Sequence, residues 1–379
     1  MKNITILGST GSIGRQTLDI VANNPDLYKI NILTTNANIT LLEKQCAMFN
    51  PNSVVIVDNK AFNDFVKNTS YKGKVLSGVE SLQLAGSSDD TDIVVSSLVG
   101  IAGLLPTINA IKSGKTILLA NKEILVVAGK YVMDLVKEKN VKILPIDSEH
   151  SAIYQCLMGE NIGDVNRIIL TASGGPFLKL SKKELQNVKV NDALNHPVWN
   201  MGTKVTIDSA TMMNKGFEVI EVRWLFDIDI SKIDVIIHRQ SIIHSMVEFV
   251  DGSIKAQLSQ PDMHFPISFA IAEENRISNN YEKIDFNKLS RLDFIAVPKN
   301  RFLCLELAYS CVRKGGNACA ILNAANEIAV SEFVNNRINF IDIPRIINNA
   351  LDKIDYINNP SIDDLLATDK ETREYVNSL

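Results

Sequence analysis

The chain has 379 residues, a formal net charge of −4 and 46% hydrophobic residues. This length exceeds one small domain and predicts two or three. Because nucleic-acid-binding surfaces are usually basic, the acidic balance argues against a nucleic-acid partner. The five cysteines form no C-x-x-C pair. We therefore expect buried, reduced thiols in a cytoplasmic protein, and no zinc site or disulfide frame.

One uncharged window, between Asp92 and Lys112, is long enough to span a membrane. It also contains Ser96, Ser97 and Pro106, and it fits a buried strand, a glycine loop and a helix. The N-terminus shows no signal-peptide pattern. We therefore expect no membrane segment.

Residues 1–150 alternate apolar runs of strand length with helix-like segments. Uninterrupted apolar strands indicate a sheet covered on both faces, and their alternation with helices indicates parallel order. The prediction is an α/β, doubly wound, Rossmann-like domain. The expected strands are "NITILGS", "KINILTT", "SVVIVDN", "DIVVSSLVG", "KTILLANKE" and "VKILPIDS".

After residue 150 the regular alternation of strand-like and helix-like segments ends. Residues 151–285 predict an α+β catalytic domain, with a turn at "VDGS" and a helix at "MNKGFEVIEVRWLF". Residues 286–300 predict a linker, and residues 301–379 a C-terminal helical domain. The strands expected in the α+β part are "RIILTASGG", "KVTIDSA", "DVIIHRQ", "HSMVEFVDGS" and "SIKAQLSQPD".

The first strand runs into glycines at Gly8, Gly11 and Gly14. Glycine permits tight turning and close backbone approach, and the following helix offers N–H groups to a pyrophosphate. The position of the motif in a βαβ pattern predicts a dinucleotide loop. The alternative is an ordinary strand–helix turn.

The second strand is expected to end near Thr34 or Thr35. NAD-preferring folds usually carry an acid near this point, about 20 residues past the glycines. The sequence reads "LTTNANIT" and has neither an acid nor a base there. It therefore favours NADP, with Asn36 and Asn38 able to donate hydrogen bonds.

Two acids, Asp147 and Glu149, follow the apolar run of "VKILPIDSEH". In an extended chain, residues i and i+2 point the same way, so both carboxylates could converge on one hard cation such as Mg²⁺ or Mn²⁺. The alternative is a helix N-cap at "DSEH". A third ligand would decide between them.

Glu218, in "DSATMMNKGFEVIEVRW", is the candidate third ligand. Asn214 and Glu218 are i and i+4 on one helical face, beside Lys215. Ser209 could cap this helix, whose N-terminus would then bind phosphate. The alternative is a solvated, charged helix with a serine cap.

Two further segments fit an anionic substrate. "TASGGPF" offers Ser173 and a glycine turn, and "HPVWNMG" offers His196, Trp199 and Met201. A tryptophan in a loop bounded by Pro197 and Gly202 suggests a cover that excludes water. The alternative for Trp199 is core packing, and His244 is expected to be a core residue.

Taken together, "GSTGSIG", "LLANKE", "PIDSEH", "SGGPF", "HPVWNMG", "DSATMMNKGFE" and "LNAANE" resemble, in order, the 1-deoxy-D-xylulose 5-phosphate reductoisomerase family. The resemblance covers nearly the whole chain. It implies rearrangement of a phosphorylated ketose and its reduction by NADPH, giving 2-C-methyl-D-erythritol 4-phosphate for isoprenoid synthesis. It also implies a divalent cation, Mg²⁺ or Mn²⁺ with Co²⁺ as a further option, and a V-shaped homodimer with the C-terminal helices as a separate bundle.

The resemblance assigns roles by motif. Asp147, Glu149 and Glu218 resemble metal ligands, and Trp199 and Met201 resemble parts of an active-site flap. The residues that resemble substrate contacts are Lys122, Ser148, Ser173, His196, Ser209, Asn214 and Lys215. The residues that resemble cofactor contacts are Thr10, Gly11, Ser12, Ile13, Asn38, Asn121, Glu123 and Gly202.

Three positions depart from the family pattern. Ala37 stands where many relatives carry a lysine near the 2′-phosphate, Ile124 replaces a common serine and Ala172 replaces a common glycine. Two other functions stay open at this point. One is a plain NADP-dependent dehydrogenase whose acids are structural, and the other is a cofactor-sensing regulator without turnover.

Overall fold

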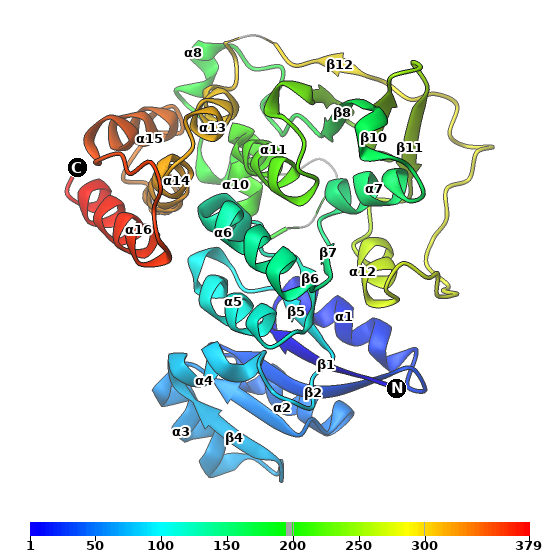
Figure 1. Ribbon diagram of the computed structural model, residues 1–379. Coiled ribbons are helices and arrows are strands. Elements are labelled where there is room, and N and C mark those ends of the chain that lie inside the picture. Colours follow the sequence, from blue (N-terminus) through cyan, green and yellow to red (C-terminus); the bar gives the residue numbers. More distant parts are fainter. Residues whose placement is uncertain (195–198, 200, 299) are drawn as a thin grey trace. The chain divides into compact units, whose positions relative to one another are not determined.

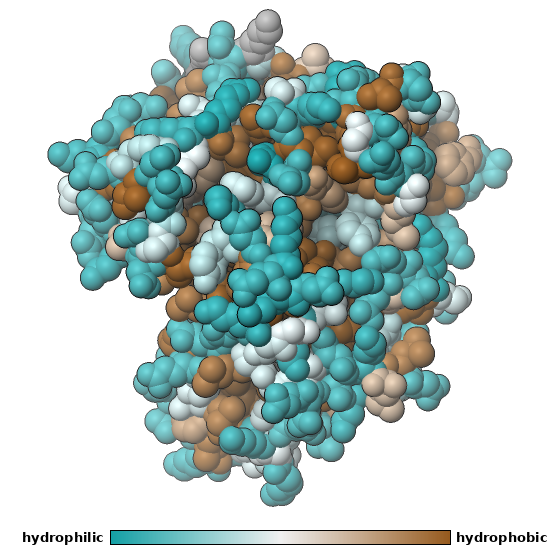
Figure 2. Space-filling view, in the orientation of Figure 1, coloured by the Kyte–Doolittle hydropathy of each residue, from teal (hydrophilic) through white to brown (hydrophobic). Residues whose placement is uncertain are grey.

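The computed structural model describes residues 1–194, 199, 201–298 and 300–379 (Figure 1). The chain divides into two compact units. The first unit comprises Met1–Ile124, Val132–Ser151 and Asp262–Tyr281. The second unit comprises Leu125–Tyr131, Ala152–Pro261 and Glu282–Leu379. On the face shown in Figure 2, polar side chains interrupt the apolar patches.

The first unit is built on a seven-stranded sheet of order β4-β3-β2-β1-β5-β6-β7. Every neighbouring pair is parallel, and the order reverses at β1, which confirms the doubly wound prediction. The strands are β1 (Lys2–Leu7), β2 (Tyr28–Thr35), β3 (Ser53–Ile56), β4 (Lys74–Ser77), β5 (Ile93–Ser96), β6 (Thr116–Leu119) and β7 (Ile143–Pro145).

Helices follow the strands of this sheet, so its central strands are buried on both faces. The helices of this part of the chain are α1 (Ser12–Ala22), α2 (Ile39–Phe49), α3 (Asn59–Asn68), α4 (Gly78–Ala85), α5 (Leu104–Lys112), α6 (Glu123–Lys139) and α12 (His264–Ile271). β4 is absent from the predicted strands. It is a four-residue edge strand and only partly buried, so it lacks the continuous apolar run of its neighbours.

The second unit contains a five-stranded mixed sheet of order β11-β10-β8-β9-β12. β10 and β11 form an antiparallel hairpin, and Gly252 in its turn has φ +84°, which confirms the predicted turn at "VDGS". The strands are β8 (Val165–Ala172), β9 (Ile233–Ile237), β10 (Ile243–Phe249), β11 (Ile254–Leu258) and β12 (Ile295–Ala296).

The expected strand at "KVTIDSA" is wrong, because this segment is a helix, α10 (Thr203–Thr211). The last six residues of α10 are all buried. Because the helix is enclosed on all sides here, its apolar residues do not follow one face, and their alternation resembles that of a strand. Lys204 and Asp208 form an i,i+4 ion pair at 2.9 Å, which is a helical spacing.

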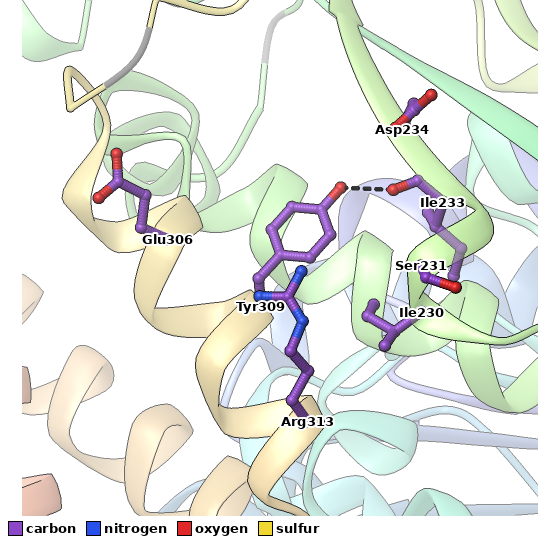
Figure 3. A pocket seen from close by; sticks show the side chains of 7 residues that line it. All are labelled: Ile230, Ser231, Ile233, Asp234, Glu306, Tyr309 and Arg313. Carbon is purple, nitrogen blue, oxygen red and sulfur yellow. Dashed lines mark hydrogen bonds between the residues drawn. The ribbon is translucent and has the colours of Figure 1, made fainter.

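The chain is helical from Leu303 onward, as predicted, and four helices make up this region. They are α13 (Leu303–Lys314), α14 (Ala318–Val334), α15 (Asp342–Lys353) and α16 (Ile362–Asn377). They share a hydrophobic cluster with α11 (Met213–Leu225), in which Phe217 and Ile220 are fully buried beside Ala308 and Leu322. On α13, the Tyr309 hydroxyl donates to the Ile233 carbonyl at 2.8 Å (Figure 3), which ties the helix to β9.

All five cysteines are free and buried, as predicted. Burial raises the pKa of Cys304 and of Cys311 to about 12, so both thiols stay protonated at neutral pH. Among the described helices, none is long and apolar enough to cross a membrane, including the window after Asp92.

The start of α1 depends on a glycine at position 14. A Cβ placed there would lie 2.4 Å from the Gly8 carbonyl oxygen and 2.6 Å from the Ser9 Cα. We expect Gly14→Ala to destabilise the protein by about 1–3 kcal/mol, as overpacking does. Gly202→Ala is the control, since no atom lies within 4 Å of a Cβ at that position. Thermal unfolding should show a lower midpoint for Gly14→Ala alone, and equal midpoints would refute the packing argument.

Candidate active site

The glycine loop lies where the strand order reverses. Gly8 has φ +91°, a conformation that favours glycine, and its N–H donates to Thr34 Oγ1 at 2.8 Å. A Cβ on Gly8 would lie 3.0 Å from the Ser97 carbonyl oxygen, so the loops that follow β1 and β5 are in contact. Open α/β sheets bind ligands in the crevice at this switch point.

The loop is held to its neighbours by hydroxyl bonds. Thr10 Oγ1 lies 2.8 Å from Thr35 Oγ1, and the buried Ser9 hydroxyl donates to Gln45 Oε1 at 2.8 Å. Gly11 is the N-cap of α1 and supplies no side-chain cap. The first N–H groups of a helix, here at Ser12 and Ile13, lack partners within the helix and suit an anion.

The end of β2 lies where the sequence predicts it, at Thr35. The next three residues are exposed and carry no charge. Asn38 is the N-cap of α2, and its side-chain oxygen accepts from the Leu41 N–H at 3.2 Å. Its amide N–H₂ is therefore the part that can donate to a ligand.

Asn121, Lys122 and Glu123 follow β6, and all three are buried. The Asn121 amide donates to the Gly100 carbonyl at 2.9 Å, while its buried Oδ1 accepts no bond from any described residue. A buried acceptor of this kind is costly unless a ligand or water fills it. Lys122 forms an ion pair with Asp147, so the loops that follow β6 and β7 are joined.

The extended geometry expected for Asp147 and Glu149 is wrong. β7 ends at Pro145, and α7 (Ser148–Leu157) begins directly after Asp147. The Asp147 carbonyl accepts from the Ser151 N–H at 2.9 Å, and Glu149 lies in the first helical turn beside the Ser148 hydroxyl, which donates to it at 2.5 Å. The extended geometry therefore fails, but the predicted convergence is confirmed, because a ligand oxygen of Asp147 and one of Glu149 lie within 4.8 Å of each other. The helix N-terminus also favours two negative charges.

In the second unit, the turn after β8 contacts α10. Gly174 and Gly175 have φ +77° and +63°, and the Gly175 N–H donates to Ser173 Oγ at 3.2 Å. A Cβ on Gly175 would lie 2.8 Å from the Ser209 carbonyl oxygen. Ser173 and Ser209, two predicted substrate contacts, are therefore brought together by close backbone packing.

Ser209 is not a helix cap. It lies inside α10, and the N-cap of α11 is Met212, with φ +64° and no side-chain cap. The apparent cap motif was misleading because the preceding segment is itself helical. Met212 in the left-handed region turns the chain sharply from one helix into the next.

On α11 the predicted face is confirmed. Asn214 Nδ2 donates to Glu218 Oε1 at 2.6 Å, and Lys215 forms an ion pair with Glu218. Lys215 is 4% exposed and Glu218 is fully buried, so the alternative of a solvated helix is wrong. A buried carboxylate held by two donors is fixed in orientation, as a ligand or a charge partner requires.

A second buried carboxylate, Asp208, was not found from the sequence. It is 1% exposed and accepts from Asn326 Nδ2 of α14 at 2.8 Å, in addition to its ion pair with Lys204. A carboxylate only accepts, so the amide nitrogen of Asn326 must face it. This contact holds α10, and with it Ser209, to the C-terminal helices.

The described part of the flap segment includes Trp199, Met201 and Gly202. Trp199 is half-buried, with its ring centre 6.3 Å from that of His244. His244 is buried and lies 2.8 Å from the Ser259 hydroxyl, so it is a core residue as expected. His196 lies outside the described residues.

The fold and these residues define a class: a dinucleotide-dependent oxidoreductase that also carries buried acids and a serine–glycine turn. Comparison with known proteins narrows it. Three family models match the chain. The model of 1-deoxy-D-xylulose 5-phosphate reductoisomerase matches residues 4–129, and two models of reductoisomerase C-terminal domains match residues 143–226 and residues 258–375.

Similar proteins cover the chain from end to end. The 1-deoxy-D-xylulose 5-phosphate reductoisomerases of Caldanaerobacter subterraneus subsp. tengcongensis and Thermoanaerobacter pseudethanolicus are 52% and 50% identical, each over 99% of this chain and 98% of the relative. A solved structure of the Zymomonas mobilis enzyme in complex with NADPH is 42% identical, with a TM-score of 0.93, and the match covers 100% of this chain and 98% of that chain.

Another solved reductoisomerase, in complex with NADPH, fosmidomycin and magnesium, is 40% identical, with a TM-score of 0.94. That match also covers 100% of this chain and 98% of the other. The chain belongs to the 1-deoxy-D-xylulose 5-phosphate reductoisomerase family, and the fold class predicted from its sequence is the fold of that family.

The Asp208–Asn326 contact leads to a stability prediction. Asn326→Leu leaves a buried carboxylate without its amide donor and should lower the free energy of unfolding by about 1–3 kcal/mol. The control is Asn348→Leu, which removes an exposed amide that donates to Asp352 at 3.0 Å and should cost well under half of that. Urea unfolding compares the two. Equal losses would show that Asp208 does not depend on Asn326.

Proposed function

We propose that this chain converts 1-deoxy-D-xylulose 5-phosphate to 2-C-methyl-D-erythritol 4-phosphate, with NADPH and a divalent cation, as a step toward isoprenoids. The observation that carries this is the family match over nearly the whole chain, together with a glycine loop placed at the switch point of the first sheet. The reaction has two parts, a skeletal rearrangement and a hydride transfer. The proposed metal and substrate residues serve the rearrangement, and the proposed cofactor residues serve the hydride transfer.

NADPH fits the first unit. The backbone approach at Gly8 and Gly14 and the start of α1 suit a pyrophosphate, and the open acceptor on Asn121 suits the carboxamide N–H of nicotinamide or a ribose hydroxyl. When bound, NADPH supplies the hydride. The residues proposed to hold it are Thr10, Gly11, Ser12, Ile13, Asn36, Asn38, Asn121, Glu123 and Gly202.

Asp147, Glu149 and Glu218 are proposed as the ligands of the divalent cation. Carboxylates are the donors that Mg²⁺ and Mn²⁺ prefer, and a reductoisomerase of this fold was solved with magnesium. When bound, the cation would polarise the oxygens of the ketose as a Lewis acid. Lys122 pairs with Asp147 and Lys215 with Glu218, so each of these two carboxylates already has a cationic partner.

The phosphate of the substrate is proposed to lie against Ser173, Ser209, Asn214 and Lys215. The first two are in contact through Gly175, and the last two share one turn of α11. Hydroxyl and amide donors with one lysine provide the charge-assisted hydrogen bonds that a phosphate needs. Solved relatives with bound fosmidomycin support a small anionic ligand in this family.

The other residues of the substrate site are Lys122, Ser148 and His196, and Trp199 with Met201 are proposed to cover it. Excluding water strengthens the polar contacts inside such a site. We further propose that the protein works as a homodimer in the cytoplasm. No nucleic acid or membrane has a part in this function.

Metal dependence tests the proposed function. Chelator should abolish NADPH oxidation driven by 1-deoxy-D-xylulose 5-phosphate, and Mg²⁺ or Mn²⁺ should restore it. Glu149→Gln should lose at least ~100-fold in turnover, since a lost ligand removes several kcal/mol of charge stabilisation. Binding of NADPH, measured by its fluorescence, should persist in this variant.

Glu160→Gln is the matched control, because Glu160 is exposed and pairs with Lys255 at the surface. It should keep parental turnover. A plain dehydrogenase, with acids that serve only structure, would turn over at the normal rate in chelator, and that result would contradict the proposal. A cofactor sensor would show NADPH binding without any turnover.

A further inference from the structure

A hollow of about 480 Å³ lies between α1 and α2 in the first unit. Its lining includes Ser12, Arg15 and Gln16 from α1 and Leu41, Lys44 and Met48 from α2. No role has been assigned above to any of these residues except Ser12. The hollow begins at the first turn of α1, directly beside the glycine loop.

The hollow carries two cationic side chains that are bonded to no acid in the described part of the chain. Among the described residues, the side chains of Arg15 and Lys44 form no hydrogen bond or ion pair, and both residues are exposed. Glu43, next to Lys44, is bound instead to Thr69 at 2.6 Å. Asp19 lines the same hollow, but its nearest ionic partner is His264 Nε2 at 3.6 Å. Unpaired cations at a concave surface attract an anion.

The position of Arg15 suggests which anion. Arg15 is the fourth residue of α1, and Leu41, across the hollow, is the third residue of α2. The Leu41 N–H is bonded to the cap Asn38, so this end of the hollow adjoins the segment that follows β2. In dinucleotide-binding folds that segment adjoins the ribose of the adenosine, where the 2′-hydroxyl or 2′-phosphate lies.

The segment itself offers no cation. It reads Asn36-Ala37-Asn38, so an NADP-binding chain must take a positive charge from elsewhere. We propose that Arg15, with Lys44 as a second and weaker cation, binds the 2′-phosphate of NADPH and sets the preference over NADH. This rests on the proposed NADPH-dependent function. An arginine suits the role because its planar fork binds phosphate through two parallel hydrogen bonds.

Direct binding tests the proposal without turnover. Dissociation constants of NADPH and NADH are measured by fluorescence, and those of 2′-AMP and 5′-AMP by calorimetry. Arg15→Ala should weaken NADPH and 2′-AMP at least tenfold and leave NADH and 5′-AMP within twofold of the parent. Lys44→Ala should give a smaller loss in the same direction.

Two further variants sharpen the test. Lys67→Ala removes one positive charge from the exposed last turn of α3, outside the hollow, and should leave all four constants unchanged. Adding Ala37→Lys to Arg15→Ala should restore much of the NADPH affinity, because it returns a cation to the 2′-phosphate. Circular dichroism and melting confirm that each variant is folded.

The outcomes are separable. Equal losses for NADPH and NADH would place Arg15 at the pyrophosphate or in support of the loop, and would overturn the proposal. If Lys67→Ala weakened NADPH binding as much as Arg15→Ala does, the effect would come from the overall positive charge of the surface. That result would also overturn the proposal. If the parent protein binds neither dinucleotide, the proposed function fails instead.

Discussion

The parallel order of the first sheet is the constraint on which the cofactor-binding part of the molecule depends. Parallel strands bring all their carboxyl ends to one edge. At that edge lie the glycine loop after β1, the asparagines after β2, Asn121 after β6 and Asp147 after β7. Residues separated by more than a hundred positions in the sequence thus lie along one edge of the sheet. Gly8 contacts Ser97, and Lys122 forms an ion pair with Asp147. The loops along this edge are therefore bound to one another.

The second unit holds charged side chains inside an apolar core. Glu218 and Asp208 are both buried, and each is matched by a lysine and an amide. An unmatched carboxylate at either place would be costly or would take up a proton. The C-terminal helices therefore contribute a hydrogen bond as well as apolar packing, since Asn326 of α14 supplies one of these amides. The proposed substrate residues on α10 and α11 are positioned by packing and by charge pairing at the same time.

Much of this could be predicted from the sequence. Fully buried strands are continuous apolar runs, and the face of α11 follows from the spacing of Asn214 and Glu218. β4 was missed because a half-buried edge strand shows little pattern. α16 is hard to delimit from the sequence because it is largely polar, although the capping box of Ser361 and Asp364 marks its start. The pairing of Asp208 with Asn326 joins residues 118 positions apart, and local pattern carries no signal for it.

The errors at the site have one origin: a short alternating or polar stretch fits both strand and helix. "KVTIDSA" fits a strand by its pattern but is a helix, and "DSEH", which fits both an extended segment and a helix start, begins a helix. The chemistry inferred from those residues does not depend on that geometry, and family membership supports it independently. What the family pattern does not explain is the uncharged segment at Ala37, for which the α1–α2 hollow offers a chain-specific answer.

The most direct test of the account is the carbon skeleton of the product. The protein is incubated with 1-deoxy-D-xylulose 5-phosphate, NADPH and Mg²⁺, and the product is identified by carbon NMR. The account predicts a branched product, 2-C-methyl-D-erythritol 4-phosphate, with its methyl group on a carbon that bears no hydrogen. A linear reduced pentitol phosphate would show reduction without rearrangement and would contradict the account.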